Sequence, residues 1–336
     1  MSDWSMLKEK DSKVIDMAIG EPVFLQECLT RKLLPSIFAS TWDVRYPYLG
    51  GNPELVDILK SYSGSKYVVV TNGAKHALQS LFAVMTGAGG HRTAAIRTPY
   101  WPSYKTIAQQ HGVTLIDIDK AKDKGVIRIC TSPNNPDGHI QREVKCGGFD
   151  IWDAAYAHPV YGFDPLMDHI EAVATVHSPA KIFGLSGLRI GWVSTDDEEI
   201  ARKVAMQVET TTSGVSNVAQ QVLARFAKDA QMKNNQALYD EAHHQLAANF
   251  TFFNRILAPF CEDVLSDGHG MFAYFSINPE EFDLEAALKM AGVRAVNGSA
   301  CGGTGNHWRL SMGLPPTQTR MALELLADAL CETSNE

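Results

Sequence analysis

The sequence has no hydrophobic run of membrane-spanning length, and its first residues, M-S-D-W-S-M-L-K-E-K-D, carry charges where a signal peptide needs an apolar segment. It also has no basic stripe, and its formal net charge is -8. Proteins that hold nucleic acid by neutralising its phosphates need the opposite charge balance. We therefore expect a soluble, cytoplasmic protein that binds neither membranes nor nucleic acid.

Closely spaced cysteine pairs are missing as well. The six cysteines show no C-x-x-C spacing and no accompanying histidine pattern: Cys28, Cys130, Cys146, Cys261, Cys301 and Cys331. Scattered cysteines of this kind are typical of reduced thiols in the cytoplasm. The sequence therefore predicts no disulfide, no structural zinc and no other metal site.

The composition that is present suits a large core, since 45% of the 336 residues are hydrophobic and 20% are charged. Short apolar runs alternate with helical stretches at 74–85 and 104–111. The predicted strands are 66–71, 94–98, 114–118, 126–130, 149–152, 173–177 and 190–194. This alternation predicts an α/β three-layer domain with its ligand site at the carboxyl ends of the strands.

Beyond residue 194 the pattern changes to two helical stretches, the second stopped by Pro259. Short strands at 271–276 and 307–312 then flank a helix at 284–291, which indicates a smaller α+β domain. The first forty or so residues lie outside the alternating pattern and are expected to pack on it. We place the large domain at 45–230 and build the small domain from 1–44 and 231–336.

The segment H-S-P-A-K-I-F-G-L-S-G-L-R-I-G-W places Lys181 in an apolar surrounding. Burying an ammonium is costly and favours the neutral amine, a nucleophile that can form a Schiff base with a carbonyl compound. Ser178 and Arg189 could hold a phosphate on the same compound. Pyridoxal 5′-phosphate carries both groups. The alternative is a structural lysine that extends from the end of a buried strand.

Two further motifs suit parts of the same cofactor. T-N-G-A-K-H-A-L turns from a strand into a helix, and a helix N-terminus at Gly73, Ala74 and Lys75 suits a phosphate. In T-P-Y-W-P-S-Y, Trp101 stands on a stiff turn from which its ring could stack on a heteroaromatic group. The alternatives are an ordinary helix start and an aromatic residue of the core.

Polar residues follow the next strands. T-S-P-N-N-P-D-G places Asn135 where it could donate to a cofactor oxygen, with Asn135-Pro136 as a candidate cis bond. In D-A-A-Y, Asp153 could pair with a pyridinium nitrogen, and Tyr156 could reach the phenolic oxygen of the same ring. An ordinary turn and a helix cap are the alternatives.

The last motif is H-W-R-L-S-M, where Arg309 stands in a predicted strand of mostly apolar residues. A half-buried guanidinium without an adjacent acid needs an anion, and its fork matches a carboxylate. A salt bridge to an acid distant in the sequence is the alternative.

The order and spacing of these motifs resemble the class I/II aminotransferases of the aspartate aminotransferase superfamily, which are fold type I pyridoxal-phosphate enzymes. The resemblance covers nearly the whole chain. It also includes I-G-E-P at 19–22, Y-P-Y-L-G-G-N-P-E-L at 46–55, N-G-S-A at 297–300 and R-L-S at 309–311. It implies a three-layer αβα large domain with a mostly parallel seven-stranded sheet, plus a smaller α+β domain.

The resemblance also implies a role for each matched residue. Lys181 is the Schiff-base lysine and proton shuttle, Asp153 the partner of the pyridine nitrogen, and Arg309 the ligand of the substrate carboxylate, with Asn135 beside it and the Gly20 backbone closing over it. The implied contacts of the cofactor ring are Trp101, Asn135 and Tyr156. The implied phosphate ligands are Gly73, Ala74, Lys75, Ser178, Arg189 and, from the neighbouring subunit, Tyr46.

A member of this family would move the α-amino group of an L-amino acid to a 2-oxo acid, in amino-acid metabolism and biosynthesis, as a homodimer with shared active sites. S-P-N-N-P-D-G and R-I-G-W are similar to the alliinase and plant tryptophan aminotransferase branch, whose chemistry includes carbon–sulfur cleavage. Lys75 and Pro179-Ala180 depart from the usual family pattern, and the chain is shorter than typical members. A decarboxylase, a β-elimination lyase and a non-catalytic cofactor-binding protein therefore remain as alternatives, and the substrate side chain is not predicted.

Overall fold

The structure, a computed structural model, describes residues 14–32, 43–87, 89–121, 125–141, 148–231, 236–266 and 268–334. At its centre is a seven-stranded sheet with the order β2-β8-β7-β6-β5-β3-β4. The strands are β2 (Tyr67–Thr71), β3 (Thr93–Ile96), β4 (Thr114–Asp117), β5 (Ile127–Thr131), β6 (Phe149–Asp153), β7 (Ala172–His177) and β8 (Gly191–Thr195). Strand β8 pairs antiparallel with both of its neighbours, β2 and β7, and the other described pairs of this sheet are parallel. The mostly parallel seven-stranded sheet is therefore confirmed.

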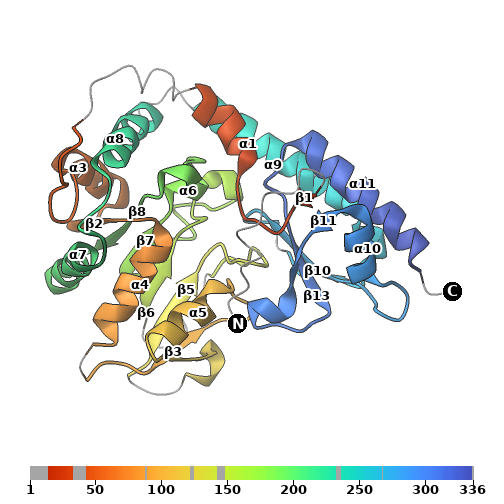
Figure 1. Cartoon of the computed structure of the whole chain (residues 1–336), viewed down its shortest axis with the longest axis horizontal. Helices are drawn as coiled ribbons and strands as arrows, with labels where there is room; N and C mark the ends of the chain where they lie inside the picture. The colour runs from red at the N-terminus through yellow and green to blue at the C-terminus, as the bar shows by residue number, and fades with distance from the viewer. Residues whose placement is uncertain are drawn as a thin grey trace.

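Helices surround this sheet, with α4 and α5 in front of it in the view of Figure 1 and α3 and α8 packed together near β2. Their bounds are α3 (Pro53–Ser63), α4 (Ala74–Met85), α5 (Ser103–Gln110), α6 (Pro179–Ile182), α7 (Glu198–Thr212) and α8 (Asn217–Gln231). Local sequence explains their ends. The Asn52 side chain caps α3 and Gly64 ends it in a left-handed conformation, while Asp197 caps α7.

A second, antiparallel sheet has four strands in the order β12-β13-β10-β9. They are β9 (Asp263–Val264), β10 (Phe272–Ser276), β12 (Val296–Asn297) and β13 (His307–Ser311). The helices α9 (Gln236–Ile256), α10 (Leu284–Ala291) and α11 (Pro316–Glu332) pack together beside it (Figure 1). Single turns of other helix types lie at Gln26–Thr30, Ile118–Lys120, Pro159–Tyr161, Ser186–Leu188, Ala258–Phe260 and Gly298–Cys301.

The described N-terminal residues, 14–32, contact strand β11 (Val293–Arg294) and the second sheet. Strand β1 (Ile15–Asp16) pairs in parallel with β11. Residues 17–26, called the strap below, contain the short helix α1 (Val23–Leu25). The carbonyl of Met17 accepts a hydrogen bond from the backbone N–H of Ser311 (2.6 Å), and the Val23 N–H donates to the carbonyl of Gly313 (2.7 Å). The strap is thereby fixed to the end of β13.

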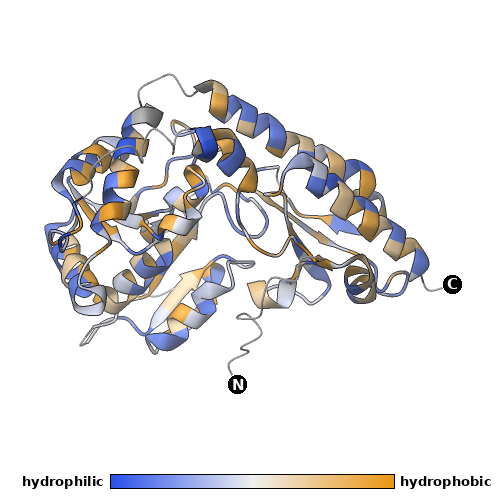
Figure 2. Ribbon diagram, turned by 45° about the horizontal axis from the view of Figure 1, so that its top comes forward, coloured by the Kyte–Doolittle hydropathy of each residue, from blue (hydrophilic) through white to orange (hydrophobic). Residues whose placement is uncertain are grey.

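Buried hydrophobic side chains of the described residues form two clusters, and the larger one includes residues of both sheets, such as Val193 and Phe272. Figure 2 shows hydrophobic and hydrophilic residues alternating along α9 and α11, as expected for helices with one buried face. Apolar contacts of this kind fix the relative position of the two sheets, because removing apolar surface from water is the main favourable term in folding. No helix among the described residues is both long and apolar enough to cross a membrane.

One backbone prediction is wrong. The described prolines with cis bonds are Pro99 and Pro133, so the bond between Asn135 and Pro136 is trans. The trans form is favoured by less than about 1 kcal/mol at any X-Pro bond, and S-P-N-N-P-D-G offers two such bonds. The surrounding fold therefore decides which proline is cis, and the local sequence does not.

Candidate active site

Lys181 lies in the single-turn helix α6, which follows β7 directly. Its ammonium donates a hydrogen bond to the carbonyl of Gly20 in the strap. The Tyr161 hydroxyl donates to the backbone carbonyl of Lys181 (2.7 Å) and so fixes the turn. Burial lowers the pKa of Lys181 to about 8, and four charged groups also act on it: Glu21, Arg309, Arg189 and Asp153. A substantial fraction of the amine is therefore neutral near pH 8.

Asp153 ends β6 and is 5% exposed. Its Oδ2 accepts a hydrogen bond from the Tyr104 hydroxyl (2.7 Å), and its Oδ1 accepts one from the backbone N–H of Ala155 (3.1 Å). Burial raises the pKa of Asp153, while these two hydrogen bonds and the charge of Lys181 lower it. The carboxyl group is therefore held in a fixed orientation inside the protein, within electrostatic reach of the lysine.

Arg309 lies on β13 and is 5% exposed. Its Nη1 donates to Oδ1 of Asn135 (2.8 Å) and its Nη2 to the carbonyl of Ala18 (2.6 Å). The guanidinium carbon lies 4.4 Å from the ring centroid of Phe272. Its Nε is buried and has no hydrogen-bond partner within the described part of the chain. A buried donor of this kind suits an anionic ligand.

Tyr156 is within electrostatic reach of both Arg309 and Asp153. Its ring packs edge-on against Phe272, with centroids 5.7 Å apart, and its hydroxyl forms a hydrogen bond with Asn135. Burial raises the pKa of Tyr156, and the positive charge of Arg309 opposes this effect. The phenol therefore stays protonated at neutral pH and can act as a hydrogen-bond donor.

The turn that carries Asn135 is itself held by side chains. Asn134 donates to Oδ1 of Asp137 (2.8 Å) and to the carbonyl of Pro99 (2.9 Å). The other oxygen of Asp137 pairs with Arg97 (2.6 Å). These contacts connect the segments that follow β3 and β5. They fix the turn that contains Asn135 and so position its side chain.

A second group of cations surrounds the N-terminus of α4. Gly73 caps this helix with a φ of 81°, and a Cβ placed on it would lie 3.0 Å from Nη2 of Arg189. The Nζ of Lys75 lies 5.2 Å from the ring centroid of Trp101. Burial, with a contribution from Arg189, lowers the pKa of Lys75. Two cations beside a helix N-terminus form a surrounding that favours an anion.

Most of the predicted site residues therefore lie in one region. Ser178 is buried at the start of α6, directly before the turn of Lys181, and the backbone N–H of Ala74 adjoins Gly191 at the start of β8. Tyr46 differs from the others, because 88% of its surface is exposed.

Sequence reasoning did not find several groups that shape the site. Tyr104 holds the Asp153 carboxyl group, Tyr161 holds the backbone of Lys181, and Phe272 lies against Arg309. Glu21 adds a negative charge near the lysine. Tyr104 lies in the motif T-P-Y-W-P-S-Y and Glu21 in I-G-E-P, so their place in a motif was the available signal for these two residues. No sequence motif pointed to Tyr161 or Phe272.

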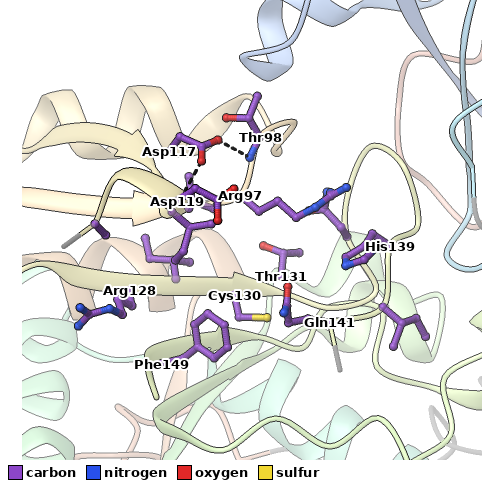
Figure 3. A pocket seen from close by; sticks show the side chains of 16 residues that line it. Arg97, Thr98, Asp117, Asp119, Arg128, Cys130, Thr131, His139, Gln141 and Phe149 are labelled. Carbon is purple, nitrogen blue, oxygen red and sulfur yellow. Dashed lines mark hydrogen bonds between the residues drawn. The ribbon is translucent and has the colours of Figure 1, made fainter. Parts of the chain in front are cut away.

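A separate cavity of about 520 Å³ lies at the carboxyl ends of β3, β4 and β5. Figure 3 shows Arg97 and His139 on one side of it, Asp117 and Asp119 on another, and Phe149 below. It does not include Lys181 or Arg309, although it reaches Thr131, whose hydroxyl adjoins Tyr104. Its lining also includes Ala121 and Gln141.

The fold is that of an aspartate aminotransferase. The structure matches a Thermus thermophilus aspartate aminotransferase tetra mutant, solved in complex with tryptophan, with a TM-score of 0.77 and 22% identity over 97% of this chain and 94% of that one. The chain belongs to the aminotransferase class I and II family, whose model matches residues 12–326. Enzymes of this family use pyridoxal phosphate.

Two curated relatives illustrate the range of this similarity. Tryptophan aminotransferase-related protein 2 of Arabidopsis thaliana is 26% identical over 67% of this chain and 57% of its own length. Aspartate/prephenate aminotransferase of Thermus thermophilus is 24% identical over 96% of this chain and 93% of its own length. The chain thus matches just over half of the plant protein and nearly all of the bacterial one.

Proposed function

We propose that this protein is a pyridoxal-phosphate-dependent aminotransferase that moves the α-amino group of an L-amino acid to a 2-oxo acid. The observation that carries the proposal is the buried amine of Lys181, whose pKa is lowered to about 8 in the same site as Asp153 and Arg309. Family membership supports the same conclusion.

The residues present fit the cofactor. Glycine at position 73 leaves room beside Arg189, where a Cβ would approach Nη2 to 3.0 Å, and this opening is cationic. We infer that the phosphate ligands are Gly73, Ala74, Lys75, Ser178 and Arg189, and that the ring contacts are Trp101, Asn135, Asp153 and Tyr156. When bound, pyridoxal phosphate supplies a carbonyl carbon for an amine and a ring that accepts electrons from the substrate.

In this proposal Lys181 is both the attachment point and the base. Its lowered pKa gives a neutral Nζ that could accept and hold a proton from the substrate Cα. Asp153 would hold the ring nitrogen in its protonated form, because a buried carboxylate stabilises a cation next to it. Tyr156 and Asn135 would serve as hydrogen-bond donors for the ring oxygen.

Arg309 would bind the substrate carboxylate, because its guanidinium is fixed on both sides and its Nε is a buried donor. The Gly20 backbone lies over the same region, next to Nζ of Lys181. Holding the carboxylate in place orients the Cα–H bond for removal. This favours proton abstraction, and hence transamination, over loss of the carboxylate as carbon dioxide.

The second candidate is a decarboxylase or a β-elimination lyase on the same fold. The S-P-N-N-P-D-G and R-I-G-W motifs, which are similar to those of the alliinase branch, keep this candidate in view. A non-catalytic cofactor-binding protein is less well supported, since Lys181, Asp153 and Arg309 are all present.

We further propose a homodimer with shared active sites and a division into domains at 45–230 and at 1–44 with 231–336. An exposed apolar stretch supports the dimer, since Val44 is 79% exposed, Tyr46 88%, Tyr48 60% and Leu49 61%. Patches of this kind mark contact surfaces. Tyr46 would reach the phosphate of the neighbouring subunit. Sedimentation of the purified protein at micromolar concentration tests this, and a monomer would contradict it. A cytoplasmic location remains part of the proposal.

The decisive experiment follows the absorbance of the purified protein with pyridoxal phosphate, before and after a panel of L-amino acids is added, and again after a 2-oxo acid is supplied. We expect a cofactor band that disappears in Lys181→Ala and persists in the surface control Lys60→Ala. One or more amino acids should convert this band while their keto acids accumulate. Release of carbon dioxide, or of pyruvate and ammonia, without this conversion would establish the second candidate.

A further inference from the structure

Glu21 occupies a position that the proposed chemistry has not yet used. It follows Gly20, whose carbonyl accepts the hydrogen bond from Lys181. Its Oε1 accepts a hydrogen bond from the Ser186 hydroxyl (2.7 Å) and another from Nε2 of Gln26 (2.9 Å). Ser186 lies 165 positions away in the sequence, in the loop between Lys181 and Arg189. The carboxyl group therefore connects the strap to the segment that carries the lysine.

This connection complements the attachment of the strap on its other side. There, the carbonyl of Ala18 accepts from Arg309, and Val23 donates to the carbonyl of Gly313. A Cβ on Gly313 would lie 2.2 Å from the carbonyl oxygen of Glu21, so the two backbones are in close contact. Glu21 is thereby held from two directions and has little freedom to move away from the lysine.

The charges around Lys181 explain why a held carboxylate matters. Two arginines raise the cost of a positive charge on Nζ: Arg309 from β13 and Arg189 after the Ser186 turn. Two acids lower this cost, Asp153 from β6 and Glu21 from the strap, and Glu21 has the larger effect of the two. Asp153 is also the carboxylate that would serve the ring nitrogen. Glu21 is then the acid whose negative charge acts mainly on Lys181.

We propose that Glu21 is a positioning residue for Lys181: its carboxylate, fixed by Ser186 and Gln26, is the counter-charge that offsets the two arginines and keeps Nζ directed at the Gly20 carbonyl. The inference rests on the proposed function in taking Lys181 as the reacting amine. It adds that the strap, besides covering the site, sets the protonation of this amine. Loss of the charge would leave the two arginines to drive the lysine toward its neutral form.

The test measures the titration of Lys181 itself in the full chain without cofactor. Competitive labelling with acetic anhydride over a range of pH, read by mass spectrometry of the peptide that contains Lys181, gives its pKa. Glu21→Gln keeps the size of the side chain and an oxygen for Ser186 but removes the charge. We expect the pKa of Lys181 to fall by about one unit in this variant. Glu54→Gln, at an exposed surface ion pair with Lys228, should cause no shift.

A folded Glu21→Gln variant in which Lys181 titrates as in the unaltered protein would overturn the proposal. If that variant does not fold, Ser186→Ala provides the test, because it retains the charge of Glu21 but removes the hydrogen bond from Ser186 that fixes the carboxylate. A smaller shift of Lys181 in the same direction then supports the proposal, and no shift contradicts it. The measurement needs neither substrate nor turnover. It therefore stands apart from transamination, whose failure would show in the absorbance experiment and leave this titration unaffected.

Discussion

At the scale of single residues, the site depends on hydrogen bonds that hold charged groups inside the protein. Asp153 is 5% exposed, and burying a carboxylate without partners is costly. The Tyr104 hydroxyl offsets this cost by donating a hydrogen bond to Oδ2 of Asp153 (2.7 Å). The same hydroxyl lies 2.9 Å from Oγ1 of Thr131. A short chain of polar groups thus reaches from β5 through α5 to the end of β6.

Replacing Tyr104 with phenylalanine should therefore lower the stability of the folded protein. The variant removes a hydrogen bond to a buried carboxyl group, and we expect it to lower the free energy of unfolding by about 1–3 kcal/mol. It should also raise the pKa of Asp153, since this hydrogen bond is one of the effects that lower it. Urea unfolding of the cofactor-free protein measures the stability. Tyr67→Phe, which removes a hydrogen bond to the Glu198 carboxylate at the exposed surface, is the matched control. Equal stability of both variants would contradict this account.

Sequence motifs predicted the groups of the candidate site mainly because several of them, such as Lys181 and Asp153, follow a predicted strand. The partners of these groups were harder to predict. Tyr104 is separated from Asp153 by 49 positions, and Ser186 from Glu21 by 165. Such pairs form only when the strands are in their final order, which local patterns do not encode. The same limit explains the wrong assignment of the cis bond to Pro136.

At the scale of elements, the anion site depends on how closely β8 approaches the start of α4. Gly191 begins β8, and a Cβ placed on it would lie 2.6 Å from the backbone nitrogen of Ala74 and 2.7 Å from the carbonyl carbon of Gly73. Both contacts are with backbone atoms, which cannot rotate away as a side chain would. A larger residue must therefore move the strand or the helix.

We accordingly expect Gly191→Ala to destabilise the protein by about 1–3 kcal/mol, the usual cost of overpacking. It should also weaken the binding of pyridoxal phosphate, because the displaced turn carries the proposed phosphate ligands. Calorimetric titration and urea unfolding measure the two effects. Gly187→Ala is a close control, since a Cβ there meets no atom within 4 Å. If both variants have the stability and the cofactor affinity of the unaltered protein, the close approach of β8 to the start of α4 is not required for either property.

Element prediction succeeded where the pattern was strong. Helices α4 and α10 have the predicted bounds, and the seven strands of the central sheet differ from prediction by one or two residues. Helices α3, α7 and α11 were not predicted. In α7 the buried residues form a narrow stripe of Ala201, Val204, Ala205 and Val208. Because small alanines supply half of this stripe, the apolar period was weak.

At the scale of the whole molecule, the stability of the fold should depend on pH through buried histidines. His177 ends β7, and its ring stacks on Trp192 with centroids 4.7 Å apart and planes 11° apart. Its Nε2 lies 2.9 Å from the Ser194 hydroxyl. Burial lowers the pKa of His177 from 6.5 to about 3. Burial likewise lowers the pKa of His158 to about 4.

The direction of the effect follows from these values. The unfolded chain binds a proton at His177 below pH 6.5, whereas the folded chain does not until about pH 3, so the stability present above pH 6.5 is lost as the pH falls. At pH 5 this single group should cost about 2 kcal/mol, since one pKa unit is about 1.4 kcal/mol. His177→Phe keeps a ring on Trp192 but does not titrate. Its loss of stability between pH 7 and pH 5, measured by urea unfolding, should be smaller by this amount. His244→Phe, at an exposed position, should retain the full loss. An unchanged pH dependence in His177→Phe would mean that the folded protein accommodates a charged His177 against the ring of Trp192.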